Sequence, residues 1–571
     1  MNREGISLVK DGVGLGTIVI ADKFPDPPVR FAAEELKRYI FEMSDVILPV
    51  RRGAARGPSV VISSAGKAGP KVTSGALPSD EEDAYCLKSV GRNLYLSGAS
   101  PRAALYAVYT FLEKLGCGFC VPGEDTVPRK RSITAPHLNM LEVPAFEFRS
   151  HIDNPFRDPF PIEGNVAVID WLAKNRFNWY HPVTNCTGEP EFYYRHRELI
   201  SSQLAKRGLC LQVGGHTMQT WLPENKYFAS HPEYYSLVDE DGEGAESVRK
   251  APSACISSPG GRRTVIRNIC NFLDRCPEVD AVDIWDADMV CYCHCSKCLQ
   301  GVTTSRMDGW RKRGQLIGAY AETLEEEILR SAYTSSFIGF LNAVARGVKK
   351  KHPNVVISSA IYGQTGVPSL YSCEKLENNV ALEVAHLPRD SFVPLAGEPR
   401  SELNRRWIAT DLTWMEKGDR VGVYEYYHSW TGSVVYPQVN VIAEDLRFLH
   451  QIGVRRIVTD QGGWSPTNIY AAARLLWNPN KPWHDLIKDF CRRYYGRAAA
   501  KMEKYWLNLE DGMRGKEGFF GELAPIFGGQ PYEGHRESRS WLLSKRKHFV
   551  KRLKAILQVT KDPVTKRRLE R

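Results

Sequence analysis

The segment from Val279 to Cys298 (VDAVDIWDADMVCYCHCSKC) concentrates side chains that could do chemistry. It starts with an apolar, β-branched run, which is typical of a strand buried on both faces. Asp286 and Asp288 follow two residues apart, so an extended chain points both carboxylates to one side. Four cysteines, at 291, 293, 295 and 298, come next. A buried strand with paired carboxylates at its carboxyl end is typical of an active-site wall in an α/β barrel.

Paired carboxylates suit the hydrolysis of a glycosidic bond, because one acid protonates the leaving oxygen while a second carboxylate attacks or activates water. Asp288 is the expected acid. The expected nucleophile or base is Glu425 in VGVYEYYHSW, with Val423 and Tyr427 on the same face. A carboxylate in so apolar a run must be paired or functional, since burying a lone charge is costly. The alternative interpretation is an Asp that caps the following loop and a Glu that binds a barrel Arg.

A second scheme within the same chemistry uses the substrate. The carbonyl of an N-acetyl group on the sugar attacks, and Asp286 and Asp288 orient it and protonate the leaving group. Other side chains near strand ends are candidates for positioning a sugar. They are His216, Trp285, Glu383, His386, Tyr427, Trp430, Asp460 and Trp464. The three tryptophans suit stacking on sugar rings, and packing at the barrel rim is the alternative for each.

The cysteines have metal-ligand spacing. Cys293, Cys295 and Cys298 form a Cys-x-Cys-x-x-Cys arrangement, which can put three thiolates around one tetrahedral zinc ion. A fourth ligand must come from elsewhere, and Cys291 and His294 are local candidates. A closed shell of four ligands leaves no open position, so such a zinc is structural and not catalytic. The alternative is a set of buried or disulfide-linked cysteines.

Eight apolar extended stretches follow one another from Phe146 onward, separated by helical or loop segments. They are Phe146–Ser150, Arg176–His181, Leu209–Gly214, Ala281–Asp286, Val355–Ile361, Val380–Val384, Val421–Tyr427 and Arg456–Thr459. Alternation of buried strands with helices predicts a parallel sheet with right-handed crossovers. Eight such units predict an α/β fold with a (β/α)8 TIM-like barrel over residues 145–475. The largest insertion is expected between the third and fourth strands, with a helix near Arg263–Arg275.

Residues 1–140 predict a separate small α/β domain. Strands are expected at Thr17–Ala21, Ser59–Ser63 and Asn93–Ser97, and helices at Val29–Met43 and Pro101–Leu115. No carboxylate cluster or glycine-rich phosphate loop stands out in this segment, so we expect a non-catalytic companion. Residues 476–571 are rich in helical patterns and predict a packing appendage.

Composition excludes several classes of partner. The chain of 571 residues is too long for one core, and its net charge of +10 is spread along it without a Lys/Arg stripe interleaved with aromatics. We therefore expect no nucleic-acid partner. No apolar run approaches the roughly 20 residues that cross a bilayer, so we expect no membrane partner either. The first residues lack a signal-peptide core, which predicts a cytoplasmic protein as written, or a periplasmic or secreted one if a leader is missing.

Several phrases resemble known families. FAAEELKRYIFEM and SGASPRAALYAVYTFLEKLGCGFCVPGEDTVP resemble the α-glucuronidase amino-terminal domain that precedes several glycoside-hydrolase barrels. YFASHPEYYSLVDEDG, followed by Cys255 and DADMVCYCHCSKC, resembles a bacterial group catalogued as domain of unknown function 4838. LLWNPNKPWHDLIKDFCRRYYGRAA is similar to the segment after the barrel in that group, so the resemblance covers about residues 20–500.

The resemblance implies a glycoside hydrolase, with a carbohydrate as partner. Some members of the group are endo-β-N-acetylglucosaminidases acting on glycans. It also implies Cys255 as the fourth cysteine of the metal site. Because a shell of four thiolates is closed, we expect no cofactor for the chemistry and at most a structural zinc. In the group an Asn-Asp followed by glycines precedes the cysteines. Here Asp288 keeps the acid, but Ala287 stands for the Asn and Met289–Val290 for the glycines. The alternative function is therefore a catalytically inactive carbohydrate-binding relative.

Overall fold

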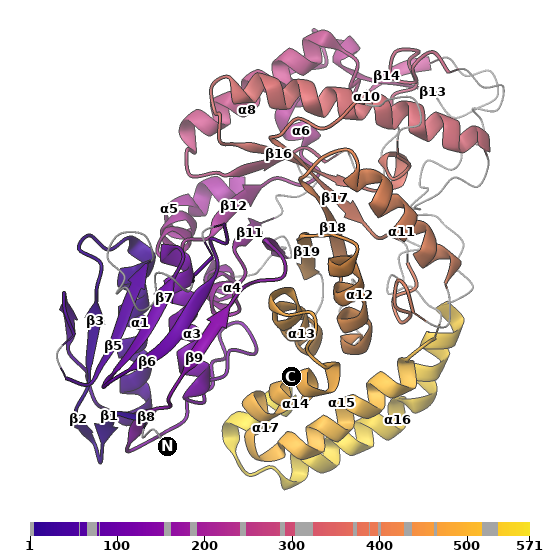
Figure 1. Ribbon diagram of the computed structural model, residues 1–571. Coiled ribbons are helices and arrows are strands. Elements are labelled where there is room, and N and C mark those ends of the chain that lie inside the picture. The colour runs from indigo at the N-terminus through magenta and orange to yellow at the C-terminus, as the bar shows by residue number, and fades with distance from the viewer. Residues whose placement is uncertain are drawn as a thin grey trace.

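The structure of the 571-residue chain is a computed structural model. It describes residues 5–55, 57–64, 77–78, 80–153, 162–182, 191–239, 247–285, 292–302, 324–368, 374–387, 389–397, 401–427, 437–461, 465–516 and 535–570. The described chain has a mixed-sheet region at the N-terminal end, a closed parallel barrel with helices around it, and a group of helices at the C-terminal end (Figure 1). This architecture confirms the predicted fold class.

Eight parallel strands close the barrel in the order in which they occur along the chain. They are β10 (Phe148–Asp153), β11 (Trp179–Pro182), β12 (Cys210–Val213), β15 (Ala281–Asp283), β16 (Val356–Ile361), β17 (Val380–Ala385), β18 (Val421–Tyr426) and β19 (Arg456–Gln461). Each predicted barrel strand coincides with one of them, with ends that differ by a few residues. The helices between and after them are α4 (Ile162–Lys174), α5 (Glu191–Ala205), α8 (Pro259–Arg275), α10 (Leu324–Lys349), α11 (Glu402–Met415), α12 (Val439–Gln451) and α13 (Pro466–Trp477).

The strand register determines which side chains face the barrel interior. Residues paired across a parallel ladder point to the same side of the sheet, and neighbours along a strand point to opposite sides. Glu383 of β17 pairs with Ala360 and with Gly422, and Tyr424 pairs with Val458. Tyr424 and Val458 lie in one apolar cluster with residues of four other strands or their ends, which identifies the inner face. The cluster contains Phe148, Ile152, Trp285, Ala360, Ala385, Tyr424, Tyr426 and Val458.

The predicted insertion lies between β12 and β15. It contains α6 (Met218–Trp221), α7 (Glu224–Tyr227), a 3₁₀ turn (Pro232–Tyr234), the antiparallel hairpin β13 (Tyr235–Asp239) with β14 (Ser247–Ala254), and α8. Ser258 caps α8, because its side chain accepts a hydrogen bond from the backbone N–H of Gly261 at 3.3 Å. The hairpin was not predicted.

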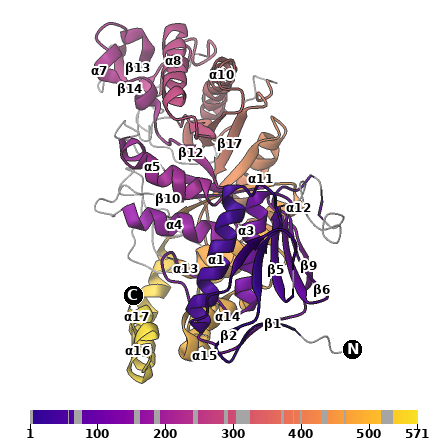
Figure 2. The ribbon, with the colours of Figure 1, turned by 90° about the vertical axis from the view of Figure 1, so that its left-hand side faces the viewer.

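The N-terminal region contains two sheets. The larger has the order β4-β3-β5-β7-β6-β9, and the smaller has the order β2-β1-β8. Their strands are β1 (Ile6–Lys10), β2 (Val13–Gly14), β3 (Thr17–Ile20), β4 (Val50–Arg52), β5 (Ser59–Ser64), β6 (Tyr85–Val90), β7 (Asn93–Gly98), β8 (Ile133–Ala135) and β9 (Asn139–Glu142). Helices α1 (Pro27–Ser44) and α3 (Pro101–Lys114) lie side by side and cover one face of the larger sheet (Figure 2). Both helices and the strands β3, β5 and β7 confirm the sequence prediction.

The C-terminal helices are α14 (Trp483–Tyr494), α15 (Ala499–Met513), α16 (His535–Val559) and α17 (Pro563–Glu570). They pack on each other and on α12 and α13, as expected for an appendage to the barrel. In the described part of the chain, no helix combines the length and the apolar character that crossing a lipid bilayer requires.

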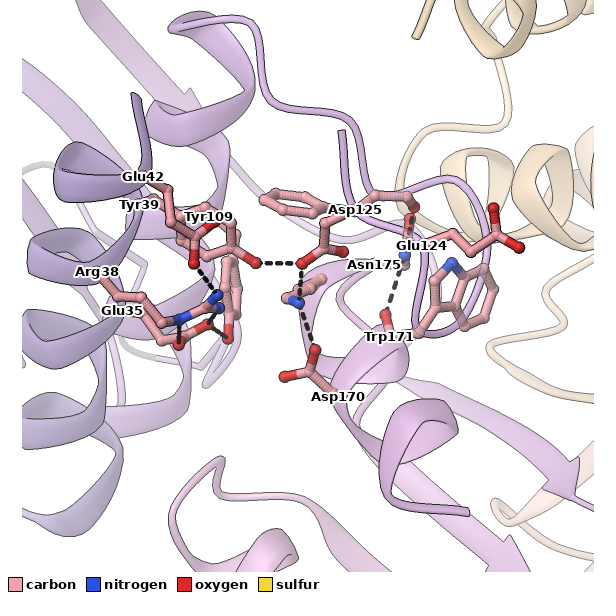
Figure 3. Close-up of polar contacts among 12 residues, drawn as sticks. Glu35, Arg38, Tyr39, Glu42, Tyr109, Glu124, Asp125, Asp170, Trp171 and Asn175 are labelled. Atoms are coloured by element: carbon pink, nitrogen blue, oxygen red, sulfur yellow. Dashed lines mark hydrogen bonds and ion pairs between the residues drawn. The ribbon is translucent and has the colours of Figure 1, made fainter. Parts of the chain in front are cut away.

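Buried charges join the N-terminal region to the barrel. Figure 3 shows Tyr39 of α1 donating a hydrogen bond to Asp125. Asp125 also accepts a hydrogen bond from Lys174 of α4 at 2.6 Å. Lys174 forms a second ion pair with Asp170, which in turn pairs with Arg207 at 2.6 Å. The Lys174 side chain is only 2% exposed, so its buried charge depends on these acidic partners for compensation.

Candidate active site and cysteine cluster

A layer of polar side chains crosses the interior of the barrel. Gln212 donates hydrogen bonds to Asp283 at 2.8 Å and to Glu383 at 3.2 Å, and Ser358 donates to the same oxygen of Glu383 at 3.0 Å. Nε2 of His181 lies 2.5 Å from Oδ2 of Asp283. These five residues come from five different strands, and all are buried. The barrel thus holds two carboxylates and an imidazole within one buried network.

The charges in this layer perturb each other. Burial and the neighbouring charge of Asp283 raise the pKa of Glu383 to about 7. Burial alone would lower the pKa of His181, but the charges of Asp283, Glu383 and Asp460 outweigh it and raise that pKa. A carboxyl group with a pKa near 7 and an imidazole with a raised pKa therefore lie together, and perturbed pKa values are a frequent property of acid–base sites.

Aromatic side chains and a third carboxylate lie toward the carboxyl ends of the strands. Asp460, the penultimate residue of β19, accepts a hydrogen bond from the hydroxyl of Tyr424 at 2.8 Å. The ring of Trp285 lies 5.9 Å from that of Tyr424 and 5.2 Å from that of His216. Tyr362 and Nε2 of His216 are 3.3 Å apart. The structure therefore brings four predicted site residues, His216, Trp285, Glu383 and Asp460, to one side of the barrel wall.

Glu425 lies on the other side of that wall, and its predicted role as a nucleophile needs correction. Its carboxylate accepts hydrogen bonds from Arg389 and from Nδ1 of His386, both at 2.8 Å. The other ring nitrogen of His386 contacts Asp411 of α11, and Arg389 also pairs with Asp445 of α12. This arrangement matches the alternative interpretation, in which the Glu binds a barrel Arg.

His386 and Tyr427 share this outward position and are corrected with Glu425. Burial lowers the pKa of His386, but Asp411 and Glu425 outweigh it and raise the value to about 9. Tyr427 is buried and lines a small space with Arg389 and Asp445. These side chains stabilise the contact of β18 with α11 and α12, on the face of the sheet turned away from the barrel interior. The remaining predicted residues, Asp286, Asp288, Trp430 and Trp464, lie outside the described residues.

The four predicted cysteine ligands converge. The sulfur atoms of Cys255, Cys293, Cys295 and Cys298 all lie within 4.8 Å of one another. Sγ of Cys255 lies 3.8 Å from Sγ of Cys295 and 3.8 Å from Sγ of Cys298. A tetrahedron with Zn–S bonds of about 2.3 Å separates its sulfurs by about 3.8 Å, so the four cysteines fit a zinc ion. The backbone N–H of Leu237 in β13 also donates to Sγ of Cys293 at 3.2 Å, which ties the hairpin to the cluster.

His181, Asp283 and Tyr424 were missed by sequence reasoning. Asp283 precedes the predicted pair Asp286 and Asp288 in the same apolar run, and its side chain points into the barrel. The positions of Ala281, Asp283 and Trp285 could have identified Asp283 as a site residue, because strand periodicity puts these three side chains on one face. His181 stands in the short stretch WYHP, which offers no periodicity to read.

Comparisons with known proteins agree with this architecture. The sequence model described as Domain of unknown function (DUF4838) matches residues 119–508. The chain resembles the solved structure of a family GH115 4-O-methyl-α-glucuronidase with specificity for decorated arabinogalactans, at 14% identity and a TM-score of 0.59, over 97% of this chain and 70% of that one. It also resembles a GH138 enzyme targeting pectin rhamnogalacturonan II, at 10% identity and a TM-score of 0.59, over 97% of this chain and 67% of that one. A search of curated proteins finds no match.

Proposed function

The chain belongs to the family described as Domain of unknown function (DUF4838), and we propose that it is a glycoside hydrolase acting on an oligo- or polysaccharide. The fold is similar to those of glycoside hydrolases over nearly the whole chain. The observation that carries the proposal is the carboxylate of Asp460 on the inner face of the barrel, at the carboxyl end of β19, next to a buried layer that holds Asp283 and Glu383. Barrel enzymes gather their catalytic groups at the carboxyl ends of the strands, and glycoside cleavage needs two carboxyl groups there.

In this proposal Asp288 is the general acid and Asp460 is the second carboxylate. Asp288 follows β15, the fourth strand, and Asp460 ends β19, the eighth. Strands that are four apart in an eight-stranded barrel lie across from each other, so the chain leaves β15 on the side of the barrel opposite Asp460. We propose that Asp288 approaches a bound sugar from that side. Asp460 replaces Glu425 as the nucleophile or base, because Glu425 is held by Arg389 outside the barrel.

Retention of the anomeric configuration is the proposed outcome. It requires about 5–5.5 Å between the two carboxyl groups, whereas inversion requires about 6.5–9.5 Å. Asp286 would orient the substrate, and in the scheme for N-acetylated sugars it would hold the attacking acetamido group. Trp285 and His216, with Trp430 and Trp464 from the following loops, are the proposed contacts to the sugar.

Glu383, His181 and Asp283 are proposed as positioning residues below the sugar. Asp283 contacts His181 and shares the amide of Gln212 with Glu383. Burial and the charge of Asp283 raise the pKa of Glu383 to about 7, so this layer holds a proton near neutral pH.

The cysteine cluster is proposed to bind a structural zinc ion. Four thiolates complete its coordination, so the ion would take no part in the reaction. The cluster joins Cys255, at the end of β14, to the segment 293–298 that follows Asp288 in sequence. Zinc would therefore anchor the end of the segment that carries the proposed acid.

Hydrolysis of a panel of aryl glycosides by the wild type and by Asp288→Asn tests the proposal. We expect turnover of at least one glycoside by the wild type, a loss of about 10³-fold or more in kcat in the variant, and retained sugar binding. Binding of sugars without turnover by either protein would instead identify an inactive carbohydrate-binding relative.

A further inference from the structure

A cavity of about 400 Å³ lies between the N-terminal sheet and helices α13 and α14. The side chains of β6, β9 and α3 line one wall, and those of α13 and α14 line the other. Arg176, which comes just before β11, also lines it, so the cavity is at the end of the barrel where strands begin. It is therefore separate from the carboxyl ends of the strands. Its volume is in the range of sites for small organic ligands.

Charged side chains dominate the lining. The cations are Lys114, Arg176, Arg474, Lys481 and Arg493, and the acids are Glu113, Glu142, Asp485 and Asp489. Most of these charges are already used. Glu113 forms ion pairs with both Arg176 and Arg474, and Asp489 pairs with Arg493 at 2.8 Å. Glu142 accepts a hydrogen bond from the indole N–H of Trp477 at 2.9 Å.

Lys114 is exposed and has no ion pair within the described residues, and two further lining residues keep a donor without a partner. Within the described residues, the ammonium group of Lys481 has no hydrogen bond or ion pair, and Nε of Arg474 has no acceptor although Arg474 is only 7% exposed. Burial and the nearby charges of Arg474 and Arg176 lower the pKa of Lys481 to about 8. Burial is the larger cause of this lowered pKa, and Glu113 and Glu142 act against it, so Lys481 is a partly buried amine whose charge the lining does not fully compensate.

We propose that this cavity binds an organic anion of monosaccharide size through its carboxylate or phosphate group. The oxygens accept a hydrogen bond from the ammonium group of Lys481, which is charge-assisted and therefore strong, and the nearby positive charge of Arg474 adds attraction. Met140, Pro482 and Leu486 line the same cavity and contact the uncharged part of the ligand. Because the walls come from the N-terminal sheet and the C-terminal helices, the bound anion holds the two ends of the chain together.

Chemical labelling of Lys481 tests the proposal at the site itself. The full chain is acetylated with acetic anhydride at neutral pH, and each lysine is followed by mass spectrometry. Lys481 is expected to react faster per exposed area than Lys226, an exposed lysine of α7, because more of its amine is unprotonated. Glucuronate or glucose 6-phosphate is expected to slow the labelling of Lys481 saturably at millimolar concentration and to leave Lys226 unaffected.

The control ligands decide what the cavity recognises. Protection by glucuronate alone assigns a carboxylate ligand, protection by glucose 6-phosphate alone assigns a phosphate ligand, and both outcomes support the proposal. Protection by glucose that equals that of the organic anions overturns it. Equal protection by inorganic phosphate, or no protection by either organic anion, also overturns it.

Calorimetry on matched variants provides a second measurement. Lys481→Gln is expected to weaken binding of the protecting anion about tenfold, and Lys226→Gln to leave it unchanged. Asp485→Asn removes an exposed acid from the lining and is expected to tighten binding a few-fold. Denaturant midpoints check that each variant folds. Unchanged affinity in a folded Lys481→Gln variant contradicts the proposal.

Discussion

Glu383 shows how the barrel interior controls a single proton. Its carboxyl group is buried beside Asp283, and two full negative charges so close together in a low dielectric are unfavourable. The pair therefore holds a proton near neutral pH, and the amide of Gln212 donates to both carboxyl groups. A protonated carboxyl group at the centre of the barrel is the feature that most distinguishes this layer from ordinary core packing.

The raised pKa of Glu383 predicts a specific pH dependence of stability. The folded protein keeps the Glu383 proton up to about pH 7, while the unfolded chain releases it near its ordinary value, so the folded state binds more protons between them. The contribution of Glu383 is thus fully present below the unfolded pKa and is lost as the pH rises through the folded pKa. Relative to Glu383→Gln, the wild type should lose on the order of 2 kcal/mol of unfolding free energy between about pH 5 and about pH 8. Urea midpoints of both proteins measure this difference, and a difference that does not change or that grows with pH refutes the assignment.

At the scale of single elements, the strands of the barrel could be predicted, but not the side to which they turn their acids. β18 (VGVYEY) is buried at every position. A parallel strand that is covered on both faces has apolar side chains on both of them. Alternation along the strand therefore shows that Glu425 and Val423 share a face, but it does not show whether that face is the inner one. Only the register with β17 and β19 resolves this. The short N-terminal strands β2 and β4 were missed for another reason, because two or three exposed residues carry no hydrophobic pattern.

We infer that the cysteine cluster stabilises the fold of the hairpin β13–β14. Most side chains of β14 are not buried, and the contacts of the hairpin include the hydrogen bond to Cys293 and one from the backbone N–H of His294 to the carbonyl of Leu237. We expect the purified protein to contain one equivalent of zinc. Chelation, or Cys295→Ser, should lower the thermal midpoint by several degrees and expose the amides of the hairpin to hydrogen exchange.

Cys270→Ser is the matched control for the zinc prediction, because Cys270 lies on α8 outside the cluster. It should retain the metal and the midpoint of the wild type. Metal analysis, thermal unfolding and hydrogen exchange measure these effects. A wild type that is free of zinc after purification in zinc-containing medium would contradict the prediction.

At the scale of the whole molecule, buried ion pairs connect the three parts of the chain. Asp83, before β6, binds Arg149 of β10 at 2.5 Å, and Glu113 of α3 binds Arg474 of α13. Arg568 of α17 binds Glu124 at 3.3 Å. Burying charges is costly unless they are paired, so these contacts favour one specific docking of the parts. The predicted limits of the domains, near 140 and 476, remain a proposal, because such contacts cross both of them.

Lys174→Ala tests this coupling. The change leaves Asp125 and Asp170 without their shared cation, and we expect a loss of about 3 kcal/mol in unfolding free energy. Arg129→Ala removes an exposed ion pair with Asp45, at 2.8 Å, and should cost less than about 1 kcal/mol. Denaturant unfolding compares the two variants, and equal effects would show that the buried contact does not hold the parts together.

The proposed hydrolysis is tested most directly by kcat/KM of two variants, Asp460→Asn and Glu425→Gln, on the best substrate of the wild type. We predict that Asp460→Asn folds normally and loses about 10³-fold or more in kcat/KM, since the carboxylate facing the sugar is removed. We predict that Glu425→Gln loses stability, because Arg389 and His386 are left with one acid fewer, while the folded fraction keeps kcat/KM within a few-fold of the wild type. The reverse result, with an active Asp460→Asn and a folded but inactive Glu425→Gln, would contradict a reaction inside the barrel between the fourth and eighth strands.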